Sequence, residues 1–187
     1  MDVQKMYYPI KSYITTSQGN KVSTKAIAHG SQNISLSGNA ILMDGSVLRG
    51  DFGNIKAGKY FIIKERSVVR PSFKLLPRGA MYLKCLMGDY IMIDEDCIVE
   101  AVQIGNYVHI GAGSVIGNST VIKDCVQVLP GTVIPPNQVI PPFSIVGGHP
   151  AKILEDEVTE QMQVTMTQAC EQFYQAFVAE NVSERKS

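Results

Sequence analysis

The side chains that could do chemistry in this 187-residue chain are few and widely spaced. Its three histidines, His29, His109 and His149, carry the side chain best suited to act as a base or a metal ligand near neutral pH. Glu95 and Glu100 lie five positions apart, and their carboxylates could hold a hard cation. No second catalytic group stands at a spacing that would complete a site around a histidine, so a structural role is the simpler interpretation.

The backbone that must position these groups shows a period of six. Branched aliphatic residues recur at this spacing, namely Ile104, Ile110, Ile116, Ile122, Val128, Ile134 and Ile140. A helix repeats every 3.6 residues and a strand every 2, so this period indicates a repeat architecture. Three sets of six return the chain to its starting direction, strands of successive coils pair at ~4.8 Å, and the aliphatic residues stack inside. The pattern resembles that of the left-handed parallel β-helix family, so we expect an all-β solenoid.

We expect one structural domain with two parts. Residues 1–150 are predicted to hold an N-terminal arm and the β-helix. Residues 71–86 lose the sixfold register, which predicts a loop that leaves the coil, and this loop either packs back on the β-helix or docks a partner. Its apolar residues are the candidate partner contacts: Phe73, Leu75, Leu76, Tyr82 and Leu83.

Residues 151–187 are predicted to form a C-terminal helix and a frayed polar tail. Apolar residues at helical spacing place the helix at residues 156–179, with Asp156 as its N-cap. The apolar face of this helix predicts that it packs along the β-helix. The tail covers residues 181–187.

The composition excludes several classes of function. Lys and Arg together number 17, as do Asp and Glu, so bulk charge favours neither nucleic acid nor a membrane surface. The four cysteines form no C-x-x-C pair, and no apolar N-terminal segment indicates a signal peptide or membrane span. We therefore expect free thiols, a cytoplasmic location and protein partners.

Residues 47–51, 62–69 and 147–152 resemble the γ-class carbonic anhydrases. In that family three histidines bind the catalytic metal. The matching positions here are Arg70, Glu95 and Glu100, and an arginine has no lone pair to offer a metal. The sequence therefore predicts a lost metal site, no catalytic residue and no cofactor, although a divergent γ-class metalloenzyme stays an alternative.

A second enzymatic alternative is a hexapeptide-repeat acyltransferase, a class that uses a histidine base in a cleft between subunits. His109 is the candidate base within the repeat. Cys125, in the run Lys123-Asp124-Cys125, could be taken for a nucleophile, but its position beside the aliphatic series favours burial in the core.

A resemblance that covers most of the chain is to the hexapeptide-repeat subunits of the dynactin pointed-end complex. It is carried by residues 19–23, 29–34, 93–97 and 122–125 and by the helix that follows. It implies a non-enzymatic scaffold in the cytoplasm and cytoskeleton that helps cap the actin-related filament and docks cargo adaptors for dynein. The implied partners are dynactin subunit 6, the actin-related pointed-end subunit, the 62-kilodalton dynactin subunit and dynein adaptors, without nucleic acid or membrane insertion.

Overall fold

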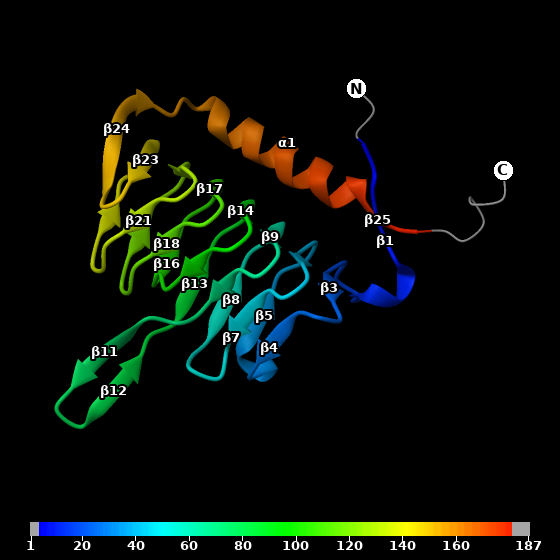
Figure 1. Cartoon of the computed structure of the whole chain (residues 1–187), viewed down its shortest axis with the longest axis horizontal. Helices are drawn as coiled ribbons and strands as arrows, with labels where there is room; N and C mark the ends of the chain where they lie inside the picture. Colours follow the sequence, from blue (N-terminus) through cyan, green and yellow to red (C-terminus); the bar gives the residue numbers. More distant parts are fainter. Residues whose placement is uncertain (1–3, 181–187) are drawn as a thin grey trace.

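The computed structural model describes residues 4–180, and for residues 155–157 the backbone alone. Most of this chain forms a left-handed parallel β-helix with three flat faces (Figure 1). Two faces are six-stranded sheets and the third belongs to a nine-stranded sheet. The predicted fold class is confirmed.

The strands of the three faces follow one another in turn along the chain. The β4–β21 face contains β4 (Ile27–His29), β7 (Val47–Arg49), β10 (Val68–Val69), β15 (Ile98–Val99), β18 (Val115–Ile116) and β21 (Val133–Ile134). The β5–β22 face contains β5 (Ile34–Leu36), β8 (Ile55–Ala57), β13 (Cys85–Met87), β16 (Gln103–Ile104), β19 (Val121–Ile122) and β22 (Val139–Ile140). The helix face contains β2 (Tyr13–Thr15), β3 (Lys21–Ser23), β6 (Ile41–Leu42), β9 (Phe61–Ile63), β14 (Ile91–Ile93), β17 (Val108–Ile110), β20 (Gln127–Val128), β23 (Ser144–Gly148) and β24 (Ala151–Glu157).

The core consists of aliphatic side chains stacked in register from coil to coil. Ile116 pairs with Val99 in the preceding coil and with Ile134 in the next. All three side chains are buried, as are the other five members of the sixfold series. Each coil therefore buries its inward residues against its two neighbours, which is how a solenoid obtains its stability.

Three tyrosines stack along the corner that precedes the helix face. Tyr60, Tyr90 and Tyr107 have positive φ angles of 55–58°, a conformation that costs an ordinary residue about 1–2 kcal/mol. The ring centroids are 5.2 Å apart for Tyr60 and Tyr90 and 5.5 Å apart for Tyr90 and Tyr107, and the rings are nearly parallel. The favourable energy of this offset ring stacking compensates for part of the backbone strain.

Helix α1 (Gln161–Ala176) lies along the helix face (Figure 1). Its buried residues Met166 and Cys170 pack in one cluster with Ile41, Ile62 and Met92, which point outward from the coils. The predicted packing of the helix is confirmed. Its predicted start is wrong, because residues 151–157 continue the sheet as β24, antiparallel to β23, and Asp156 is therefore not an N-cap.

The N-terminal arm joins the other end of α1. Strand β1 (Met6–Tyr8) pairs in parallel with β25 (Phe177–Ala179), which follows α1 directly, so the predicted helical run to residue 179 ends earlier. Lys21 donates hydrogen bonds from Nζ to the carbonyl oxygens of Tyr174 and Phe177, where a cation is favoured by the helix dipole. The arm also holds a short 3-10 turn, Ile10–Ser12, and a second such turn, Ser31–Asn33, precedes β5. The predicted tail, 181–187, lies outside the described residues.

The segment predicted as a loop contains a β-hairpin. Strands β11 (Phe73–Leu76) and β12 (Gly79–Tyr82) pair antiparallel, and the hairpin projects away from the prism (Figure 1). It leaves the β4–β21 face after β10 and returns to the β5–β22 face at β13. Most of it therefore does not pack back on the coils.

Candidate functional site

Arg70, Glu95 and Glu100 occupy turns at the ends of three strands. Arg70 follows β10, Glu95 follows β14 and Glu100 follows β15. Arg70 Nε lies 3.7 Å from Glu100 Oε1, so these two form an ion pair, and no contact joins Glu95 to either of them in the described residues. Across the same residues, no three His, Cys, Asp or Glu side chains are grouped so that they could hold a metal ion. The chemistry that this arrangement offers is charge pairing.

A polar cluster that the sequence did not predict lies beneath α1. Asp94 accepts a hydrogen bond from His109 Nε2 at 2.8 Å through Oδ2, and its Oδ1 lies 2.8 Å from Lys64 Nζ. Lys64 Nζ is also 5.4 Å from the centre of the Phe173 ring in α1. The three groups come from residues that lie far apart along the sequence, and only the register of β14 with β17 brings His109 close to Asp94.

The Asp94 carboxyl is stabilised in its charged form. Its burial by itself raises its pKa, but the hydrogen bonds and charges of His109 and Lys64 outweigh that effect and hold the pKa below its ordinary value. The candidate base His109 is thus engaged with Asp94 in a half-buried position. His29 and His149 are exposed and lie elsewhere on the prism.

Cys125 lies at a corner with a φ of 57° and is buried. Burial raises the pKa of its thiol. A buried thiol with a raised pKa stays protonated near neutral pH and is a poor nucleophile.

The root of the hairpin is firmly attached to the prism. The Asn118 side chain accepts a hydrogen bond from the Phe73 N–H through Oδ1 and donates one from Nδ2 to the Phe73 carbonyl oxygen, both at 2.9 Å. The Tyr82 ring stacks on Phe52 with centroids 4.9 Å apart. Toward the tip the apolar side chains are open to solvent, and Leu75 is 79% exposed.

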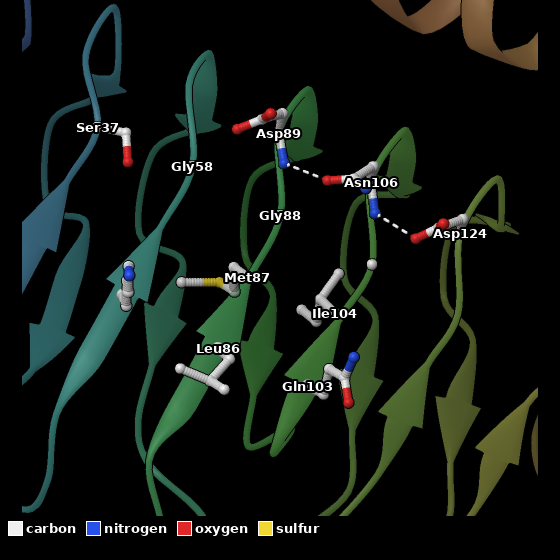
Figure 2. Close-up of a pocket in the computed structure, with 12 residues that line it drawn as sticks. Ser37, Gly58, Leu86, Met87, Gly88, Asp89, Gln103, Ile104, Asn106 and Asp124 are labelled. Carbon is white, nitrogen blue, oxygen red and sulfur yellow. Dashed lines mark hydrogen bonds between the residues drawn. The ribbon is translucent and has the colours of Figure 1, made fainter.

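A shallow groove of about 450 Å³ lies over the β5–β22 face and the corner beside it (Figure 2). Its polar side chains hold the backbone of neighbouring coils: Asn106 Oδ1 accepts from the Asp89 N–H at 2.8 Å, and Asp124 Oδ1 accepts from the Asn106 N–H at 2.7 Å. A Cβ at Gly105 would lie 2.7 Å from the Asp124 backbone nitrogen, which explains the glycine. These polar groups therefore stabilise the corner.

Comparison with known proteins identifies the family. The family model of dynactin subunit 5 matches residues 1–182. The chain belongs to the dynactin subunit 5 family. A curated dynactin subunit 5 from Dictyostelium discoideum is 38% identical over 106 residues, which are 57% of this chain and 54% of the relative. The chain therefore matches about half of the length of that dynactin subunit 5.

Solved structures share the fold of this dynactin subunit 5 family member. A hexapeptide transferase family protein from Anaplasma phagocytophilum is 22% identical, with a TM-score of 0.63 over 83% of this chain and 89% of that one. The N-acyltransferase AntD from Bacillus cereus, solved with dTDP and coenzyme A, is 16% identical, with a TM-score of 0.65 over 81% and 88%. At these identities the likeness shows the fold alone.

One further property of this family member concerns membranes. In the described residues, 4–180, no helix combines the length and the apolar character that a bilayer span requires.

In this dynactin subunit 5 family member, Asp94→Asn is expected to lower the free energy of unfolding at neutral pH by about 1–3 kcal/mol, because it removes a hydrogen-bonded charge. In the unchanged chain, the stability from the lowered Asp94 pKa is present above the ordinary aspartate value of about 3.9 and is lost as pH falls through the folded value. The variant should lack this part of the acid dependence. Urea unfolding at a series of pH values measures both effects.

The matched control is Asp96→Asn, which breaks an exposed ion pair with Arg66. We expect a change of at most about 1 kcal/mol. Equal losses in the two variants, or unchanged acid dependence in Asp94→Asn, would contradict the assignment of a stabilising charge cluster beneath α1.

Proposed function

We propose that this chain is a non-enzymatic scaffold subunit of the dynactin pointed-end complex. In this role it helps to cap the actin-related filament and docks cargo adaptors for dynein transport, in the cytoplasm and at the cytoskeleton. The observation that carries the proposal is the family match along residues 1–182. The stacked, side-chain-filled prism supports it, because such a structure is rigid enough to hold partners at fixed positions.

The non-enzymatic part of the proposal rests on side-chain chemistry. Arg70 stands at a position where the γ-class enzymes carry a metal-binding histidine, and it is paired with Glu100. A guanidinium keeps its charge and offers no lone pair, so it repels a cation from this position. His109 is bound to Asp94 beneath α1, which leaves Nε2 engaged.

The proposed partners are dynactin subunit 6, the actin-related pointed-end subunit, the 62-kilodalton dynactin subunit and dynein cargo adaptors. Within residues 4–180, no further strand pairs with the sheet edges at β4 and β5 at one end of the prism or at β21 and β22 at the other. Open edges pair readily with other chains unless they are covered. The hairpin residues Phe73, Leu75, Leu76, Tyr82 and Leu83 are the proposed contacts of a further partner.

Reconstitution tests the scaffold proposal. When the chain is co-expressed with the three pointed-end partners, we expect one complex of fixed composition in size-exclusion chromatography with mass measurement. A stable homotrimer that excludes the other subunits would contradict the proposal.

Metal analysis of the same purified complex tests the enzymatic alternative. Stoichiometric zinc, cobalt or iron that is lost in Glu95→Gln and Glu100→Gln variants would favour a divergent γ-class enzyme over a scaffold.

A further inference from the structure

The hairpin segment has an unusual distribution of charge for a chain that is neutral overall. Residues 66–88, between Glu65 and Asp89, include five basic residues and no acidic one. Arg66 is paired with Asp96, and Arg70 lies beside Glu100. For Lys74, Arg78 and Lys84 the described part of the chain provides no ion-pair partner. The three cations thus face solvent on or beside the hairpin.

Apolar side chains lie on both faces of the same hairpin. The antiparallel register sets Phe73 opposite Tyr82 and Leu75 opposite Ala80 on one face. Lys74 lies opposite Met81, and Leu76 opposite Gly79, on the other. Leu75 on the first face is 79% exposed, and Leu76 and Met81 on the second face are 49% and 44% exposed, so the described residues cover neither face. A two-stranded hairpin with uncovered apolar groups is marginally stable by itself and gains by being covered.

The outer edge of β11 is already hydrogen-bonded to a side-chain amide, that of Asn118. The Asn118 amide accepts from the Phe73 N–H and donates to the Phe73 carbonyl oxygen, as a residue of a neighbouring strand would. The backbone groups of an antiparallel pair alternate between the partner strand and the open edge. The N–H and C=O of Leu75, two residues on, therefore face the same open edge.

We infer that this hairpin binds an extended acidic segment of a partner protein, which adds as a strand to the open edge of β11. Its backbone continues from Asn118 to the Leu75 N–H and C=O, its carboxylates pair with Lys74, Arg78 and Lys84, and its alternate apolar side chains cover Leu75 or Leu76. The inference deepens the proposed adaptor docking and rests on it. A protein is favoured over an anionic bilayer because lipid tails offer no hydrogen-bond partners for an open strand edge.

The test measures binding of a short fluorescent peptide of alternating glutamate and valine to the full-length chain. We expect saturable binding that is at least about tenfold weaker in the combined variant Lys74→Glu, Arg78→Glu and Lys84→Glu, since three ion pairs are lost. The matched control reverses three exposed lysines elsewhere, Lys5→Glu, Lys11→Glu and Lys123→Glu, and should bind nearly as well as the unchanged chain. A peptide of alternating lysine and valine should not bind.

The strand edge is tested separately with Leu75→Pro and Leu75→Ala. Proline removes the outward N–H but no bond to β12, so the hairpin should persist in both variants, as circular dichroism and thermal unfolding will show. We expect Leu75→Pro to weaken peptide binding several-fold more than Leu75→Ala.

Four results would overturn the inference. They are no peptide binding to the unchanged chain, equal loss in the two charge-reversal variants, equal binding by the two Leu75 variants, or hairpin-dependent binding to phosphatidylserine vesicles without binding to the peptide. Assembly with the pointed-end subunits is measured on the same variants. If the unchanged chain assembles with the pointed-end subunits but does not bind the peptide, this inference alone is rejected. If the unchanged chain does not assemble, the proposed function is rejected.

Discussion

Replacing Ile116 by aspartate is expected to leave little soluble protein. Ile116 has no exposed surface and lies between Val99 and Ile134 in the aliphatic core. The change removes an isoleucine side chain and buries an unpaired carboxylate, which together should cost at least about 4 kcal/mol. A domain of this size has a total stability of about 5–15 kcal/mol, so much of it would be lost. The soluble yield and urea unfolding measure the effect.

The neighbouring position supplies the control. Val115 alternates with Ile116 along β18 and points outward on the β4–β21 face, where it is half-buried. Val115→Asp should leave soluble protein that unfolds within about 1.5 kcal/mol of the unchanged chain. Similar losses at both positions would show that the inward and outward alternation is wrong, and Ile116→Val should cost only about 0.5–1.5 kcal/mol.

Replacing Met166 by lysine is expected to detach α1 from the helix face. Met166 is 5% exposed and packs in one cluster with Ile62 and Met92. Removing the buried side chain and forcing an ammonium toward an apolar surface should cost about 3–5 kcal/mol. Because the coils have their own core, we expect the amides of α1 to lose hydrogen-exchange protection while those of the central strands keep it.

Val164→Lys is the control within the same helix. Val164 is 58% exposed, and the new side chain would extend into water. We expect a change of at most about 0.5 kcal/mol in unfolding and unchanged protection of α1. If the two variants behave alike, the buried stripe of α1 has been assigned to the wrong side.

The features that the sequence predicted well are those that repeat. Each coil has the same local geometry and points its member of the series from Ile104 to Ile140 into the core. The periodic pattern was therefore enough to indicate the solenoid. The apolar stripe that includes Met166 likewise indicated a packed helix. The beginning of that helix was missed because residues 151–157 are held in a strand by pairing with β23, a contact that helical periodicity does not record.

The candidate sites also include features that the sequence could predict and features that it could not. That Arg70 cannot serve as a metal ligand can be read from the chain, because residue type alone decides whether a lone pair exists. The cluster of Lys64, Asp94 and His109 could not be predicted from the sequence. Its residues are brought together by the register of separate coils, and no fixed spacing along the chain relates them. The assignment of the hairpin apolar residues as partner contacts stays a prediction.

The sequence by itself determined the three-sided prism, its aliphatic core and its family, since each of these depends on residue types at regular or local spacing. Only the tertiary structure decided that the arm at β1 pairs with β25 beyond the helix, and that a basic hairpin projects from a corner with an open edge beside Asn118. Such contacts join segments that are distant in sequence, and they form where packing and hydrogen bonding across the whole molecule outweigh local preference.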